Sequence, residues 1–348
     1  MKTSAAILSL LLASSSGPCI WDSDTLADEL RGLPDGLRLL TGRWHRHSAD
    51  YYAARVAKLP AQLDEHDGEL AAYDDLAVAH ERLGDRDAAL RVMDRKRKAL
   101  DALAEGASEA MATALREHRY RELANRGTFL AHAGRFDEAI ESLEAALALN
   151  PAAHFGRERW QIEAIRYVAA CRRDPSLWTT HDFLSFANVL SDAGGAPVTG
   201  RSSYTAQRLP QARVVAWDEL HTAVVGMLRF GGLEGAELYR TLGDLHLAKQ
   251  DLHLAWWAYG VALERGHAAR ESIEAARQAI VEHWKEAVVH NRRKLAIPTD
   301  DEFRRVRASA ARWLAEFHRL EREALARGAD VASDAVLKDL LARADAAV

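Results

Sequence analysis

Three segments of the chain repeat the same order of small, bulky and turn residues, and this self-similarity limits the possible folds more than any other feature. The clearest copy covers residues 123–151, where Gly134 separates two helical patterns and Pro151 ends the second. Small side chains at Gly127 and Ala139 allow the two helices to approach each other closely. The segment is therefore predicted to form a closely packed pair of helices.

Two weaker copies lie on either side of this segment. The earlier copy, residues 73–93, has its turn at Gly84, 50 residues before Gly134. The later copy, residues 239–262, has Gln250 in place of the turn glycine and His267 in place of the closing proline. A spacing of 50 residues exceeds the length of a two-helix repeat, so the helices are predicted to be lengthened over residues 101–120.

The pattern resembles the tetratricopeptide repeat, a two-helix unit of about 34 residues. This resemblance implies an all-α fold: an interrupted helical-repeat solenoid with capping helices, whose concave groove holds a protein or peptide partner. The groove positions carried over from the family are Arg121, Asn125, Thr128 and His132 in the clearest copy, Asp74, Val78, Glu81 and Arg82 in the earlier copy, and Arg240 and Asp244 in the later copy. Val78, Thr128 and Asp244 stand where a clamp for a C-terminal carboxylate has Asn, so that class of ligand is not expected.

Two features outside this groove could also contact a partner. The loop at residues 193–210 is long and lacks a helical pattern, and such loops often carry function. Its candidate contact residues are Arg201, Tyr204 and Arg208. The pair Trp256–Trp257 occupies adjacent helical positions, which cannot both face the same neighbour, so an exposed ring is possible there.

The remaining sequence divides around the repeats. The expected segments are a signal peptide (1–18), an N-terminal helical cap (19–69), two repeats (70–151), an irregular helical segment (152–235), the later repeat (236–269) and C-terminal capping helices (270–348). Within the irregular segment, residues 176–192 and 211–229 are expected to form a degenerate helix pair. An apolar stripe over residues 303–320 predicts a long terminal helix, with Thr299 or Asp300 as its N-cap.

The first 18 residues have the pattern of a secretory signal peptide. Lys2 is followed by an apolar run, Ala5–Ala13, and then by small residues. The run is well short of the about 20 residues that a membrane-spanning helix needs. We therefore expect export to the periplasm or beyond, without a transmembrane segment. One alternative is lipid anchoring through Cys19, although Pro18 departs from the small-residue pattern of that processing site. The other is an apolar N-terminus that is retained without cleavage.

Composition narrows the classes of partner. The chain has 46 Lys and Arg against 51 Asp and Glu, a net charge of −5, which disfavours binding to nucleic acid. Residues 19–26 and 154–160 fall outside the repeat pattern. Together with the signal peptide, they make the chain similar to exported bacterial tetratricopeptide-repeat proteins. That similarity implies a compartment and an architecture but no reaction.

No recognised catalytic pattern occurs in the sequence. Residues 195–202 read G-x-x-x-x-G-R-S, but Arg201 stands where a phosphate-binding loop needs Lys, and no strand pattern precedes them. The 15 histidines show no ligand set at the spacing of a zinc site. We therefore expect no catalytic residue, no metal and no cofactor.

The leading hypothesis is a non-catalytic scaffold of the bacterial cell envelope that binds a protein or peptide. One alternative is an enzyme, such as a hydrolase, with its site in residues 152–235. Clustering of His154, Glu158, His181 and Asp182 would favour that alternative. Another is a structural or oligomerisation module, for which self-association is possible.

Overall fold

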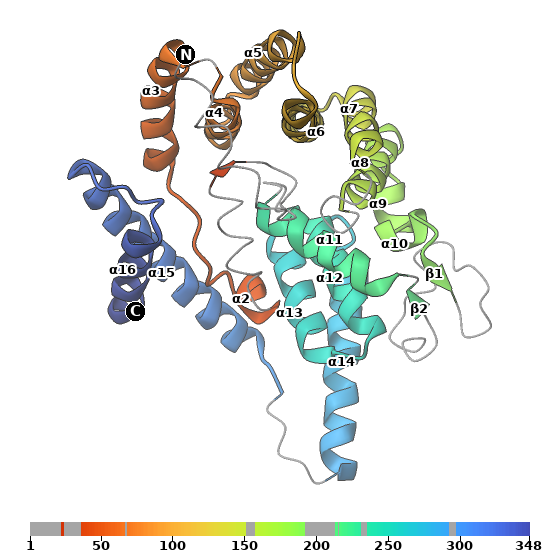
Figure 1. Cartoon of the computed structure of the whole chain (residues 1–348). Helices are drawn as coiled ribbons and strands as arrows, with labels where there is room; N and C mark the ends of the chain where they lie inside the picture. Colours follow the sequence, from red (N-terminus) through yellow and green to blue (C-terminus); the bar gives the residue numbers. More distant parts are fainter. Residues whose placement is uncertain are drawn as a thin grey trace. The chain divides into compact units, whose positions relative to one another are not determined.

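The computed structural model describes residues 22–23, 36–66, 68–150, 157–191, 213–214, 216–230, 235–291 and 297–348 (Figure 1). In these ranges the fold is helical apart from a two-residue antiparallel pairing of β1 (Leu190–Ser191) with β2 (Arg213–Val214). The helices are α2 (Gly36–Thr41), α3 (Ala49–Glu65), α4 (Leu70–Arg82), α5 (Arg86–Ala104), α6 (Glu109–His132), α7 (Phe136–Leu149), α8 (Arg157–Arg173), α9 (Leu177–Thr180), α10 (Phe183–Phe186), α11 (Trp217–Phe230), α12 (Ala236–Ala248), α13 (Leu252–Glu264), α14 (Arg270–Asn291), α15 (Asp300–Ala326) and α16 (Asp334–Ala347). The predicted all-α helical-repeat fold is confirmed.

Contacts divide the chain into two compact units. The first comprises Met1–Leu33 and Ala49–Ile162, and the second comprises Pro34–Ser48 and Glu163–Val348. In the first unit each helix from α3 to α7 packs against the next one along the chain. In the second unit α12 packs against α11 and α13, α13 also contacts α14, and α15 contacts α16. Among the described helices, none is both long and apolar enough to cross a bilayer.

The helix ends of the two earlier repeats follow local signals in the sequence. Gly84 and Gly134 adopt positive φ angles of 85° and 78°, which glycine tolerates and other residues rarely adopt. The Asp85 side chain accepts a hydrogen bond from Ala88 N and so caps α5. Helices α5 and α6 extend through the interval between the repeats, to Ala104 and from Glu109. The prediction of lengthened helices is therefore confirmed.

Glycines allow the close approach of paired helices. A Cβ atom at Gly127 would lie 2.6 Å from Leu143 Cγ of α7, and one at Gly243 would lie 2.5 Å from the Tyr259 ring of α13. Such distances are too short for carbon atoms, so a larger side chain would force the paired helices apart. The small residues of the repeat pattern thus fix the interhelical packing in both units.

The N-terminal and C-terminal parts of the second unit are joined by packing. Helix α2 contacts α13 and α15. Glu321 of α15 is fully buried and holds the segment after α2, because its Oε2 accepts a hydrogen bond from Ser48 N at 2.8 Å and its Oε1 lies 2.5 Å from His47 Nδ1. Thr299 caps α15 by accepting a hydrogen bond from Glu302 N at 3.2 Å, which confirms one of the two predicted caps.

In the second unit, the predicted helix over residues 176–192 is wrong, and the possible exposed ring at Trp256–Trp257 is not found. Residues 176–192 do not form one long helix, because the short helices α9 and α10 and strand β1 divide them. The capping box of Asp182 and Ser185 starts a new helix after the extended residue His181. The rings of Trp256 and Trp257 are both buried, because the residues around α13 cover more than one of its faces.

Gln250 lies in the turn after α12 and adopts a positive φ of 59°, a backbone conformation that favours glycine. Replacement by Gly is expected to raise the free energy of unfolding by about 0.5–1 kcal/mol, because a side chain is disfavoured in the left-handed region. Urea denaturation measures the change. Gln250→Ala is the control and should lie close to the wild type, since alanine also carries a Cβ atom. A Gln250→Gly variant no more stable than Gln250→Ala would contradict the expectation.

Candidate functional site

Two of the predicted groove residues on α6 bind the preceding repeat. Asn125 donates a hydrogen bond from Nδ2 to Asp74 Oδ1 of α4 at 3.1 Å. His132 Nδ1 lies 2.6 Å from Glu81 Oε1, also of α4. Asn125, Asp74 and Glu81 are buried. The first helices of successive repeats are therefore joined by polar contacts between groove positions.

The other two predicted residues on α6 contact different partners. Thr128 is buried, and its Oγ1 accepts a hydrogen bond from Gln161 Nε2 of α8 at 2.9 Å. Arg121 Nε lies 3.1 Å from Glu117 Oε1, one turn earlier on the same helix. The structure thus places the four α6 residues in contacts within the first unit. Their contact with a partner stays a prediction.

A buried ion pair joins α4 and α5. Lys96 of α5 has no exposed surface, and its Nζ lies 2.7 and 2.6 Å from the two carboxylate oxygens of Asp74. Burial raises the pKa of Asp74 to about 6, although Lys96 opposes the shift. Burial likewise lowers the pKa of Lys96. The Asp74 carboxylate therefore binds both Lys96 and Asn125, and it links α4, α5 and α6.

His118 adds an uncharged group to the same region of α6. Burial lowers its pKa to about 3, and the positive charges of Lys96 and Arg121 act in the same direction. The imidazole is therefore neutral at physiological pH. The positive charge here comes from Lys96 and Arg121.

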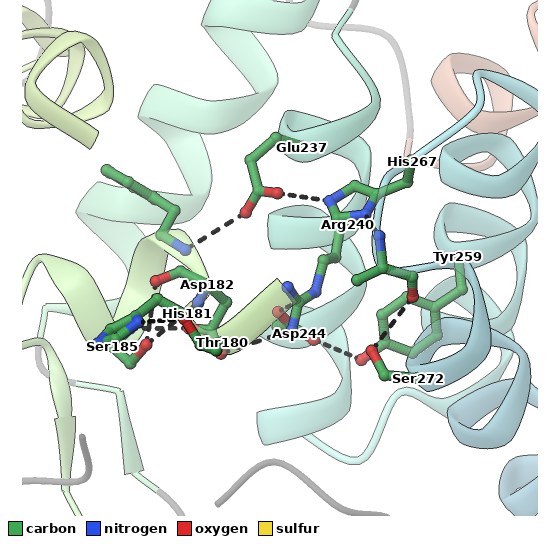
Figure 2. Close-up of polar contacts among 12 residues, drawn as sticks. Thr180, His181, Asp182, Ser185, Glu237, Arg240, Asp244, Tyr259, His267 and Ser272 are labelled. Carbon is green, nitrogen blue, oxygen red and sulfur yellow. Dashed lines mark hydrogen bonds and ion pairs between the residues drawn. The ribbon is translucent and has the colours of Figure 1, made fainter. Parts of the chain in front are cut away.

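In the second unit, the predicted residues Arg240 and Asp244 belong to one buried polar cluster (Figure 2). Arg240 Nη2 lies 3.5 Å from Asp182 Oδ2 at the N-terminus of α10, and Arg240 Nε lies 3.5 Å from Asp244 Oδ2. The Tyr259 hydroxyl of α13 donates a hydrogen bond to Asp244 Oδ1 at 2.6 Å. One guanidinium is therefore shared by carboxylates from two helices.

Glu237 extends this cluster along α12. Its Oε1 accepts a hydrogen bond from Phe183 N of α10 at 3.3 Å, and its Oε2 lies 2.5 Å from His267 Nε2. His267 Nδ1 in turn accepts a hydrogen bond from Ala269 N at 2.9 Å. His267 stands where the repeat has its closing proline. Its side chain therefore attaches the turn after α13 to Glu237 of α12.

Burial and neighbouring charges shift the pKa values of Asp244 and Arg240 in this cluster. Burial raises the pKa of Asp244 to about 7, and the attraction of Arg240 offsets only part of that effect. Although burial opposes it, the carboxyl groups of Asp244, Glu237 and Asp182 raise the pKa of Arg240 above its usual range. Arg240 thus stays charged, whereas Asp244 can take up or release a proton near neutral pH.

The structure does not bring the residues of the predicted loop site or of the alternative enzyme site into one cluster. Arg201, Tyr204, Arg208 and His154 lie outside the described residues, as do the signal peptide and Cys19. Of the residues proposed for an enzyme site, Glu158 accepts a hydrogen bond from the Tyr120 hydroxyl, whereas Asp182 binds Arg240. Within the part of the chain that the structure describes, no group of three or more His, Cys, Asp or Glu side chains could hold a metal ion.

Sequence reasoning missed Lys96, although a signal for it exists. Lys96 falls on the buried stripe of α5 with Ala89, Met93 and Leu100, at steps of three or four residues. A charge on such a stripe requires a buried partner of opposite charge. The pattern could therefore have predicted a carboxylate facing α5, but not that Asp74 supplies it.

Comparison with known proteins supports the repeat assignment. The family model described as the tetratricopeptide repeat matches residues 120–153, which cover the second half of α6 and all of α7. No curated protein matches the chain. The match coincides with the helix pair in which Gly127 packs on α7. Residues 120–153 are therefore identified as a tetratricopeptide repeat.

Proposed function

We propose that the chain is a non-catalytic scaffold of the bacterial cell envelope, which binds a protein or peptide segment on the first helices of its repeats. The matched repeat, at residues 120–153, carries this proposal, because such repeats typically mediate protein interactions. The contacts Asp74–Asn125 and Glu81–His132 support it, since they hold α4 and α6 as adjacent parts of one surface.

Recognition on this surface would involve the side chains that reach solvent. Asn125 and Thr128 are buried and would shape the surface from below. The Glu117 side chain is 40% exposed and lies beside Arg121 on α6. A partner that contacts Arg121 would therefore pass close to Glu117. Because the Glu117 side of this ion pair is exposed, the pair contributes little to stability and position 117 can be changed without unfolding the protein.

Site-specific photocrosslinking tests the location of the partner. A photoreactive phenylalanine analogue at position 117 is expected to give a crosslinked protein or peptide in cells that produce the chain. The same analogue at Glu141, an exposed position on α7, is the matched control and should give none. Equal crosslinking from both positions, or none from position 117, would contradict a groove on the first helices. Mass spectrometry of the crosslinked product identifies the partner.

Export is tested separately from binding. Residues 1–40 fused to a reporter enzyme that is active only outside the cytoplasm are expected to give activity. A fusion in which Leu8 and Leu11 are replaced by Arg is expected to lose it, because charges interrupt the apolar run. Equal activity of the two fusions would contradict a signal peptide at residues 1–18.

A further inference from the structure

The polar cluster around Arg240 holds more acidic than basic groups. Asp182, Glu237 and Asp244 surround Arg240, and among the described residues it is the guanidinium that faces all three (Figure 2). Full ionisation would leave three negative charges against one positive charge. Unbalanced charge is costly inside a protein, so one of these groups is expected to be neutralised by a proton.

His267 does not supply the missing positive charge. Its Nδ1 accepts a hydrogen bond from Ala269 N, so that nitrogen carries a lone pair and no proton. The proton of the neutral imidazole therefore resides on Nε2, which donates to Glu237. Protonation of Nδ1 would break the bond to Ala269. His267 is thus held as a neutral donor by the geometry of the turn.

The aromatic hydroxyl groups around the cluster also stay neutral. Tyr259 of α13 donates a hydrogen bond to Asp244, and Tyr167 of α8 donates one to the carbonyl oxygen of His181, next to Asp182. Burial raises the pKa of Tyr167, and the negative charge of Glu237 raises it further. Among these groups, Asp244 is the carboxyl whose pKa burial raises to about 7. Asp182 and Glu237 each accept a backbone hydrogen bond, from Ser185 N and Phe183 N respectively.

We propose that the folded protein keeps a proton on the Asp244 carboxyl, and that release of this proton weakens the attachment of α10 to α12. With Asp244 neutral, the charge of Arg240 is balanced by Asp182, which holds the N-terminus of α10. With Asp244 ionised, the Arg240 guanidinium interacts with two carboxylates, Asp182 and Asp244. The remaining negative charge then repels Asp182 and Glu237, which are the polar anchors of α10.

The direction of the pH effect follows from linkage. Burial raises the pKa of Asp244 to about 7 in the folded protein, above the value of an exposed carboxyl group. The stabilisation from the bound proton is therefore complete below the pKa of an exposed carboxyl group, declines as pH rises above that value, and is lost above about pH 7. The attachment of α10 is expected to be firm at pH 6 and weaker at pH 8. The scaffold would thus respond to the pH of its surroundings within the physiological range.

Hydrogen exchange of the full chain tests this proposal. After correction for intrinsic rates, protection of the segment 177–190 is expected to fall about tenfold from pH 6 to pH 8, with most of the fall below pH 7, because opening releases a proton only while the Asp244 carboxyl of the folded protein holds one. Asp244→Asn removes the titrating group and should give protection that does not change with pH. Asp218→Asn, at an exposed site on α11, is the matched control and should behave as the wild type. A pH-independent wild type, or an Asp244→Asn variant with the wild-type dependence, would overturn the proposal.

A second measurement applies if Asp244→Asn does not fold. The carbon-13 NMR signals of Asp side chains in the wild type should include one carboxyl group that titrates near pH 7. Tyr259→Phe removes a hydrogen bond that favours the ionised form, so the midpoint of that titration is expected to move upward. Absence of such a titrating group, or an unchanged midpoint in Tyr259→Phe, would also overturn the proposal.

Discussion

Replacement of Asp74 by alanine is expected to lower the free energy of unfolding by about 3–5 kcal/mol, the usual cost of breaking a buried ion pair. The Lys96 ammonium group has no exposed surface and is held by both oxygens of Asp74. Alanine would leave it without a counter-ion, and Asn125 would lose its acceptor. Urea denaturation at pH 7, followed by circular dichroism, measures the change.

Two further variants show whether the loss comes from the unpaired charge. Asp74→Leu combined with Lys96→Met replaces the pair by apolar side chains and is expected to recover most of the lost stability, because no charge then remains buried. Asp87→Ala removes an exposed acid from the first turn of α5 and should change stability by less than about 0.5 kcal/mol. A double variant as unstable as Asp74→Ala would show that packing, not charge, causes the loss.

Replacement of Glu321 by alanine is expected to have the second largest effect, a loss of about 3 kcal/mol. Glu321 is fully buried on α15, and its two oxygens bind His47 and the backbone N–H of Ser48. Alanine would leave that buried N–H without an acceptor and would open a cavity. Thermal denaturation measures the loss, and Glu321→Gln should recover part of it because an amide oxygen can accept the bond from Ser48.

The same residue makes the second unit sensitive to acid. Although burial opposes the shift, the bonds from His47 and Ser48 lower the pKa of Glu321. A depressed pKa means that the stabilisation is present above the pKa of an exposed glutamate and is lost as pH falls through the folded value. The difference in stability between wild type and Glu321→Gln should therefore shrink in acid. A difference that stays constant from pH 7 to pH 3 would contradict this assignment.

The sequence by itself determined the helix pairs and their turns, because these depend on residues close together along the chain. Apolar spacing marks the helices, and glycine at positions 84 and 134 supplies the backbone freedom that each turn needs. The small residue Gly127 also carried information about packing, since a repeat places it opposite a fixed position of its partner helix. The family match at residues 120–153 lies where these local signals are strongest.

Only the tertiary structure decided which charged groups are buried and with what partner. Lys96 and Asp74 are 22 residues apart, Arg240 and Asp182 are 58 apart, and Ser48 and Glu321 are 273 apart. Spacing along the chain does not predict such pairs, because they form only when helices pack together in three dimensions. The groove positions on α6 and α12 were located by helical register, whereas their burial follows from the neighbours that cover them. Helix periodicity is a local property, but the desolvation that sets a pKa belongs to the assembled fold.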